Sequence, residues 1–259
     1  MNVLEFGAAL LGNTFGDHRF VRLTPFQKPW ILFYDKLDRK IFKIDSRSRI
    51  DSITANQIFT QEDYSVRRIK RNPDIQSRYQ SILASGKTPL IIDCGCNIGL
   101  SSYYFSKIYP KSYVVGIEPS ADNVEMANQI CSPLGNVSIK QAAIGSKEGY
   151  VEIKNQNADA NKFEVIQRAK ASIPLLTIPM IQQEVPNHEL FIVKVDIEGF
   201  EKNLFSSNTE WIDECFTLFV EPHDWMFPKE QTIRNFLSVV SGYNRDFLIF
   251  EDNIISIKN

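Results

Sequence analysis

The sequence predicts an α/β fold, in which a mostly parallel sheet is covered by helices. Three observations support this prediction. Short apolar runs alternate with helical patterns after residue 85, one run passes through a glycine-containing turn into a helix, and several runs end in an acidic residue. The 259 residues, 43% hydrophobic and 23% charged, suit one globular domain of this type with additional elements.

The stretch from Pro89 to Gly99 contains the clearest strand–turn–helix unit. An apolar run leads to Asp93, a turn with Gly95 and Gly99 follows, and residues 100–108 have the pattern of a helix. A short apolar run between proline and glycine is typical of a strand buried on both faces. Strand, turn and helix in this order place a ligand at the carboxyl end of the strand.

The residues of this turn favour S-adenosylmethionine (SAM) over a dinucleotide as the ligand. A dinucleotide fingerprint has a glycine two residues after its first glycine, where this chain has Asn97. Asp93 at the strand tip would repel a pyrophosphate, but it could hold a cationic group. SAM carries an ammonium and a sulfonium and has no phosphate. NAD is the alternative that the pattern leaves open.

A second acid follows the next predicted strand. Tyr113–Glu118 ends 25 residues after Asp93, and a helix is predicted from there through Cys131. A carboxylate at this position can accept hydrogen bonds from both ribose hydroxyls of an adenosyl cofactor. NAD folds use the same device, so Glu118 supports an adenosyl cofactor without choosing between SAM and NAD. Val137–Gln141 is predicted as the third strand.

Acidic residues and a histidine follow the fourth and fifth predicted strands. Leu190–Asp196 is the fourth strand, and Glu198 and Glu201 come directly after it. The fifth strand, Phe216–Glu221, is followed by His223. Because consecutive units of such a sheet are usually neighbours, we expect the groups after both strands to lie side by side. For Glu201 we expect only the stabilisation that an acid gains at the start of a helix.

The chain before the glycine turn is predicted to be an extension. Residues 1–85 contain two strands, Trp30–Tyr34 and Ile41–Ile44, which we expect to form a hairpin, and residues 86–259 form the catalytic domain. The extension is either a structural cap or a lid on the substrate side. Residues 155–170 are polar and predicted as a loop or short helix beside the substrate.

Three further elements are expected outside the central strands. Thr60–Ala84 has a helical pattern that Pro73 interrupts, and Pro228–Val240 has the pattern of an amphipathic helix. The chain is predicted to end in a β-hairpin that turns across Asp252 and Asn253.

Two motifs resemble a known family. The run from Asp93 to Gly99 resembles the SAM-binding motif of class I methyltransferases, and Lys194–Glu201, with the pattern K-x-D-x-E-G-x-E, is similar to the FkbM family within that class. The resemblance covers roughly residues 58–225. It implies a Rossmann-like class I methyltransferase fold, with a seven-stranded mixed sheet and a C-terminal antiparallel hairpin. It also implies that a methyl group passes from SAM to a hydroxyl of a small molecule, sugar or glycan, with S-adenosylhomocysteine as the product.

The resemblance also implies which residues bind the cofactor. In this class the residues after the third strand lie against adenine, which adds Gln141 and Ala142 to the set. The predicted cofactor-binding residues are Asp93, Gly95, Asn97, Gly99, Glu118, Gln141, Ala142 and Asp196.

The predicted catalytic residues are His223, Asp196 and Glu198. A hydroxyl is a poor nucleophile near neutral pH, and an imidazole has a pKa suited to taking its proton, so His223 is the predicted base. Asp196 could orient this histidine, bind the acceptor hydroxyl, or ligate a divalent cation with Glu198 or Glu221. Hard oxygen ligands would suit Mg²⁺ or Ca²⁺. The cluster permits such a cation and does not require it, so no metal ligand is assigned.

Composition narrows the classes of partner. The formal net charge of −2 gives no electrostatic case for binding nucleic acid. No apolar run approaches the roughly 18 to 20 residues that span a bilayer, and the N-terminal apolar stretch lacks the basic start of a secretory signal. The four cysteines have no zinc-binding spacing, so we expect a reduced protein of the cytoplasm.

Two other function classes stay open from the sequence. An NAD(P)-dependent oxidoreductase is disfavoured because Asn97 replaces a fingerprint glycine. A SAM-binding module without catalysis is disfavoured because both the cofactor motif and the acidic residues with His223 are present. The sequence does not identify the acceptor, decide between O- and N-methylation, or indicate the oligomeric state.

Overall fold

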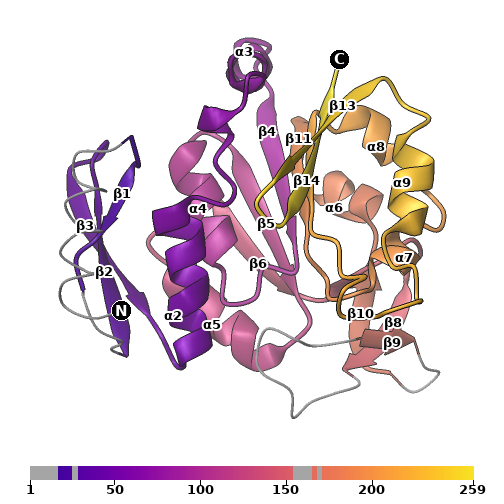
Figure 1. Cartoon of the computed structure of the whole chain (residues 1–259), viewed down its shortest axis with the longest axis horizontal. Helices are drawn as coiled ribbons and strands as arrows, with labels where there is room; N and C mark the ends of the chain where they lie inside the picture. The colour runs from indigo at the N-terminus through magenta and orange to yellow at the C-terminus, as the bar shows by residue number, and fades with distance from the viewer. Residues whose placement is uncertain (1–16, 25–28, 154–164, 168–170) are drawn as a thin grey trace. The chain divides into compact units, whose positions relative to one another are not determined.

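The computed structural model describes residues 17–24, 29–153, 165–167 and 171–259. The chain divides into two compact units, residues 1–65 and 66–259. Each unit has a sheet and a buried core of its own (Figure 1). Helix α3 (Asn72–Ala84), which we placed in the N-terminal extension, belongs to the second unit.

The first unit contains the predicted hairpin and one further strand. β2 (Trp30–Asp35) and β3 (Lys40–Asp45) pair antiparallel, and β1 (Phe20–Arg22) pairs with the other edge of β2. Helix α2 (Arg49–Asn56) and a π-helical turn (Gln57–Gln61) follow the sheet.

An aromatic cluster forms the core of this first unit. Phe20, Phe33 and Phe59 are fully buried, and the ring of Phe59 lies 5.3 Å from that of Phe20 and 5.0 Å from that of Phe33. Arg19 donates to both carboxylate oxygens of the buried Asp35, at 2.9 and 2.8 Å. A hairpin alone is marginally stable in water. The burial of these aromatic side chains therefore explains the stability of the three-stranded sheet.

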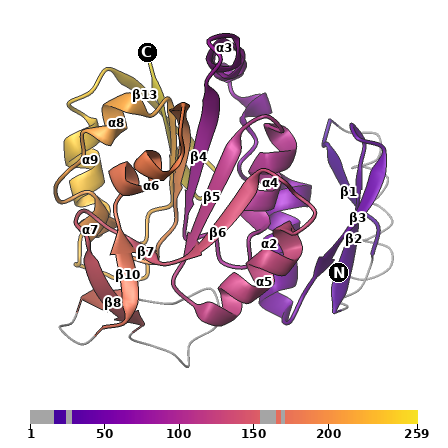
Figure 2. The ribbon, with the colours of Figure 1, turned by 180° about the vertical axis from the view of Figure 1, so that it is seen from behind.

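The second unit is built on a seven-stranded sheet with the strand order β13-β14-β12-β11-β4-β5-β6 (Figures 1 and 2). Its strands are β4 (Thr88–Cys94), β5 (Tyr113–Glu118), β6 (Val137–Gln141), β11 (His188–Val195), β12 (Thr217–Val220), β13 (Arg245–Phe250) and β14 (Asn253–Lys258). All pairs are parallel except those of β14, which runs antiparallel to β12 and β13. This topology confirms the predicted Rossmann-like class I methyltransferase fold with its C-terminal hairpin.

Helices cover both faces of this sheet, which explains why its central strands are apolar throughout. Leu90, Ile91 and Ile92 of β4 are fully buried. One face is covered by α4 (Leu100–Ile108) and α5 (Ala121–Cys131), while α3 lies at the amino end of β4 (Figures 1 and 2). The other face is covered by α6 (Ile178–Glu184), α8 (Trp211–Glu214) and α9 (Arg234–Val240).

A small second sheet follows β6. Its order is β7 (Ala143–Ile144), β10 (Ile173–Leu176), β8 (Gly149–Ile153) and β9 (Val165–Gln167). The strand Val165–Gln167 replaces part of the loop that we predicted over residues 155–170. The rest of that loop, residues 155–164 and 168–170, lies outside the described residues.

Three boundaries differ from those predicted. Pro73 begins α3 instead of interrupting a longer helix, because proline fits the first helical turn, where no backbone donor is needed. Helix α9 begins at Arg234, six residues after Pro228. The final hairpin pairs Phe250 with Asn253, so its turn lies one residue earlier, at 251–252.

No helix within the described parts of the chain is both long and apolar enough to cross a membrane. The longest of them, α3, has 13 residues.

Candidate active site

The turn between β4 and α4 lies directly against the end of β11. Gly95 has a φ of +77°, and a Cβ built there would lie 1.8 Å from the backbone oxygen of Asp196. Only glycine fits such an approach. Gly99 has a φ of +82°, and a Cβ there would lie 3.0 Å from Ala127 and 3.1 Å from Cys131, both in α5. The predicted cofactor turn is therefore held between β11 and α5.

Asn97 takes the place of the middle glycine of a dinucleotide fingerprint. Its φ of 50° is left-handed, a conformation that asparagine adopts more readily than most residues. The backbone N–H of Asn97 donates to the carboxylate of Glu118 at 3.1 Å. Asn97 therefore allows the same kind of tight turn that a glycine would allow at this position.

Glu118 lies at the end of β5 and holds the turn from the side. It is 5% exposed, and it also accepts from the backbone N–H of Ser120 at 2.9 Å. Burial raises the pKa of Glu118 to about 7, although the hydrogen bonds from Ser120, Asn123 and Asn97 oppose the shift. Gln141 pairs with Glu118 across the neighbouring strand, and Ala142 donates its N–H to the Glu118 carbonyl at 3.1 Å. These three predicted cofactor residues therefore lie next to one another at the carboxyl edge of the sheet.

Asp93 is fully buried, and its partners belong to the protein itself. One carboxylate oxygen accepts from the hydroxyls of Ser101 and Ser102, both at 2.6 Å. The other lies 3.2 Å from the ammonium of Lys194. The cation beside Asp93 is therefore the side chain of Lys194. Sequence reasoning missed this lysine, although Lys194 and Asp93 are direct partners in the β11–β4 register.

His223 and Glu201 form a buried pair. Nδ1 of His223 lies 2.9 Å from Oε1 of Glu201, which also accepts from the backbone N–H of Ile197 at 3.1 Å. Glu201 is fully buried and His223 is 1% exposed. The expectation that Glu201 serves only the start of its helix, α7 (Glu201–Leu204), is therefore wrong, because its carboxylate also orients His223.

Three carboxylates face the other nitrogen of this imidazole. Nε2 of His223 lies 3.5 Å from Asp196, 3.7 Å from Glu198 and 3.9 Å from Glu221. Each separation is longer than a normal hydrogen bond. The groups that we predicted to meet after the fourth and fifth strands therefore do meet, around a single imidazole nitrogen.

The charges of this cluster shift its pKa values. Burial lowers the pKa of His223, but Glu201, Asp196 and Glu198 outweigh burial and raise it to about 9. Burial, followed by the charge of Asp196, raises the pKa of Glu198 to about 7 and that of Glu221 to about 8. The imidazole is accordingly protonated near neutral pH, where it compensates the surrounding carboxylates.

The turn after β11 has an unusual backbone that fixes Glu198. Glu198 has a φ of 53°, in the left-handed region that disfavours a non-glycine residue. Gly199 follows with a φ of +92°, and a Cβ there would lie 2.6 Å from the ring of Phe227. Oε2 of Glu198 is buried and has no hydrogen-bond partner among the described residues.

Three of these side chains also have the donor atoms of a cation site. One ligand atom each from Asp196, Glu221 and His223 lies within 4.8 Å of the others. Carboxylate oxygens and an imidazole nitrogen are suitable ligands for several divalent ions.

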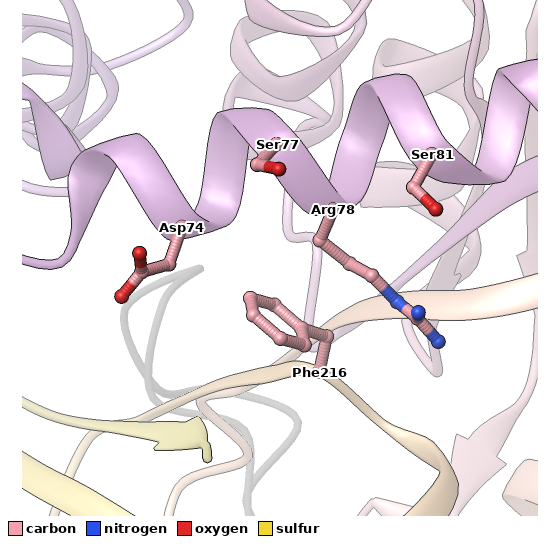
Figure 3. Close-up of a pocket in the computed structure, with 5 residues that line it drawn as sticks. All are labelled: Asp74, Ser77, Arg78, Ser81 and Phe216. Carbon is pink, nitrogen blue, oxygen red and sulfur yellow. The ribbon is translucent and has the colours of Figure 1, made fainter.

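A separate pocket of about 270 Å³ lies beside α3 (Figure 3). Its lining residues are Asp74, Ser77, Arg78, Ser81 and Phe216. Phe216 immediately precedes β12, so this pocket lies at the amino end of the strand, away from the carboxyl edge that carries the cluster. None of the predicted site residues lines it.

Comparison with solved structures finds several methyltransferases among the chains that resemble this one. The chain resembles a Staphylococcus aureus protein assigned as a caffeoyl-CoA O-methyltransferase, with 14% identity and a TM-score of 0.42 over 80% of this chain and 92% of that one. It also resembles magnesium protoporphyrin IX methyltransferase from Synechocystis with bound SAM, with 10% identity and a TM-score of 0.38 over 80% and 96%. A Geobacter sulfurreducens methyltransferase gives 15% identity and a TM-score of 0.38 over 83% and 92%.

Similarity this distant does not establish an activity, which we infer from the chain's own residues. No model of a known protein family matches the chain, and no curated protein matches its sequence. Membership of the FkbM family therefore stays a prediction.

Proposed function

We propose that this protein is a SAM-dependent methyltransferase that methylates a hydroxyl of a small molecule, sugar or glycan. The observation that carries the proposal is the contact between the two halves of the site. The glycine turn packs so closely on the backbone of Asp196 that a Cβ at Gly95 would lie 1.8 Å from its oxygen. A cofactor held by this turn would therefore be next to the cluster around His223.

The cofactor would be held by the residues along the carboxyl edge. The turn at Gly95, Asn97 and Gly99 leaves room for a ligand to approach the backbone, and Glu118 at its side would accept hydrogen bonds from the ribose. Gln141 and Ala142, next to Glu118, are the proposed adenine contacts. Asp93 would act indirectly, because its contacts with Lys194, Ser101 and Ser102 fix the position of the turn.

When bound at this edge, SAM would supply an electrophilic methyl group for an acceptor oxygen, with S-adenosylhomocysteine as the leaving group. His223 takes the hydroxyl proton at Nε2, the nitrogen that faces the cluster. Glu201 holds Nδ1 and stabilises the imidazolium that forms. Asp196 and Glu198 bind the acceptor hydroxyl and align it, which supplies much of the rate in a direct displacement.

A divalent cation is the second candidate for activating the hydroxyl. Asp196, Glu221 and His223 would hold it, and it would lower the pKa of a bound hydroxyl. Nε2 of His223 cannot bind a cation and act as the base at the same time, so the two candidates exclude each other. A chelator would remove activity only if the cation is required.

We further propose membership of the FkbM family and a location in the cytoplasm. The run from Lys194 to Glu201 supports the family. All four cysteines are free and buried, which favours a reducing compartment.

A methyl-transfer assay tests the proposed function. Protein is incubated with SAM that carries an isotope-labelled methyl group and with a panel of sugars, glycans and small alcohols. Label is expected in at least one hydroxylated acceptor, and His223→Gln should reduce the rate by roughly 10²- to 10⁴-fold, the usual contribution of a general base. Glu230→Gln, at an exposed acid, is the control. Labelling that is confined to amines would contradict O-methylation, and equal rates in both variants would remove His223 from the mechanism.

A further inference from the structure

Lys194 is the one charged member of the K-x-D-x-E-G-x-E run to which the sequence assigned no role. Its side chain is 2% exposed, although lysine is rarely buried. A buried ammonium is stable only when carboxylates and hydrogen bonds compensate the water that it loses. Its surroundings therefore indicate what it does.

Three oxygen atoms surround the Lys194 ammonium. It donates to the backbone carbonyl of Gly95 at 2.7 Å, and it lies 3.2 Å from Asp93 and 3.3 Å from Asp196. The contact with Gly95 is a hydrogen bond, and those with Asp93 and Asp196 are ion pairs, since Oδ1 of Asp93 has no hydrogen-bond partner among the described residues. The group thus joins the tip of β4, the cofactor turn and the end of β11.

Asp196 extends this link to the histidine. Oδ2 of Asp196 faces Lys194 at 3.3 Å, while Oδ1 faces Nε2 of His223 at 3.5 Å. One carboxylate therefore lies between the ammonium that holds the turn and the imidazole of the cluster. A displacement of Lys194 would move both the Gly95 carbonyl and Asp196.

We propose that Lys194 is a positioning residue that couples the cofactor turn at Gly95 to the carboxylate of Asp196 in the cluster around His223. The cofactor half of this inference rests on the proposed function, whereas the link to Asp196 and His223 does not. Glu201, Asp196, Glu198 and Glu221 are the charged groups that face His223.

The test compares Lys194→Met with Lys202→Met. Lys202 lies in the nearby helix α7 with its side chain 55% exposed, so its substitution removes one positive charge where water screens it. Two quantities are measured for each protein: the Kd of S-adenosylhomocysteine by calorimetry, and the imidazole ¹⁵N chemical shifts of His223 by NMR. The chain has three histidines, and His223→Gln assigns the signal.

Lys194→Met should weaken the binding of S-adenosylhomocysteine about tenfold or more. It should also change the ¹⁵N shifts of His223, because Asp196, which faces Nε2, loses its ion-pair partner. Lys202→Met should change neither. A role confined to stability would lower the melting temperature of Lys194→Met and leave both quantities as in the control, which would overturn the inference.

Lys194→Arg decides the question if Lys194→Met does not fold. Arginine keeps the charge, but its planar fork cannot reproduce the three contacts of an ammonium. It should change the ¹⁵N shifts of His223 less than Lys194→Met does, because a cation stays beside Asp196, and it should still weaken the binding of S-adenosylhomocysteine several-fold. Unchanged affinity in Lys194→Arg overturns the inference. If the wild-type protein binds no S-adenosylhomocysteine, the proposed function and the cofactor half fail together. The ¹⁵N shifts of His223 then still test the link to Asp196.

Discussion

Nδ1 of His223 lies 2.9 Å from Oε1 of Glu201, and both side chains are buried. This contact fixes the tautomer of the imidazole, because a proton on Nδ1 is donated to the carboxylate. Nε2 is then the nitrogen that can exchange a proton with a ligand. It faces Asp196, Glu198 and Glu221. The pair therefore places one titrating atom at the carboxyl edge of the sheet.

Removing the charge of Glu201 should lower the pKa of His223 and the rate of methyl transfer. Glu201→Gln keeps the shape of the side chain, and its amide oxygen can still accept from Nδ1. We expect the pKa to fall from about 9 towards the ordinary value of 6.5. The rate should fall by up to roughly 10⁴-fold, as when the carboxylate that orients a catalytic histidine is replaced by an amide. NMR titration and single-turnover rates measure the two effects.

Glu210→Gln is the matched control for this substitution, because it changes an exposed acid immediately before α8. An unchanged pKa of His223 in Glu201→Gln would show that Glu201 does not hold the imidazolium.

Activity should rise with pH between 7 and 9. A base must be neutral to take a proton, and although burial lowers the pKa of His223, the charges of Glu201, Asp196 and Glu198 raise it to about 9 in the free protein. The ratio kcat/KM reports pKa values of the free enzyme, so it should increase through this range and level off above it. In His223→Gln this rise should be absent. A profile that is flat or falls over the same range would contradict the role of His223 as base.

Stability should change with pH in the opposite direction. The folded-state pKa of His223 is raised, so its stabilising contribution is complete below the unfolded pKa of about 6.5 and is lost as pH rises through about 9. The free energy of unfolding should therefore fall from pH 6.5 to 9 more steeply in the wild-type protein than in His223→Gln. Urea denaturation at four pH values measures this difference, and equal slopes would count against a buried imidazolium.

The importance of the close approach of Gly95 to Asp196 can be tested by comparing alanine substitutions at Gly95 and at Gly86. Gly95 and Gly86 both have a φ of +77°, but a Cβ at Gly86 meets nothing within 4 Å. Gly86→Ala therefore shows the cost of the backbone alone, about 1 kcal/mol. Gly95→Ala adds a clash with backbone and should cost at least about 2 kcal/mol more, with loss of S-adenosylhomocysteine binding. Similar costs at both positions would show that the turn can move away from β11.

A chelator distinguishes the base from the cation. If His223 is the base, treatment with EDTA should leave the rate unchanged, and added Mn²⁺ should not increase it. If Asp196, Glu221 and His223 hold a required ion, EDTA should abolish transfer and Mn²⁺ should restore it. That second result would replace the base mechanism with a metal-assisted one.

The sheet could be predicted because each strand carries its own signal. β4, β5 and β11 are short apolar runs that end next to acids, and their strand–turn–helix order leaves few topologies. The meeting of Asp196 with His223 followed from that topology alone.

The partners of single side chains could not be predicted in this way. Glu201 looked like an ordinary acid at a helix start, and only the packing of α7 brings it to His223. Lys194 and Asp93 are 101 residues apart and meet through strand register, which one sequence does not specify. The raised pKa of His223 depends on the first of these contacts, because the charges of Glu201, Asp196 and Glu198 raise it against the effect of burial.

Calorimetry of cofactor binding tests the central claim most directly. Wild-type protein, Glu118→Ala and the control Glu125→Ala, an exposed acid of α5, are titrated with SAM, S-adenosylhomocysteine and NADH. We predict that the wild type and the control bind SAM or S-adenosylhomocysteine, that Glu118→Ala binds at least about tenfold more weakly for loss of the ribose contacts, and that NADH does not bind. Binding of NADH without SAM would contradict the assignment of the glycine turn and the methyltransferase activity with it.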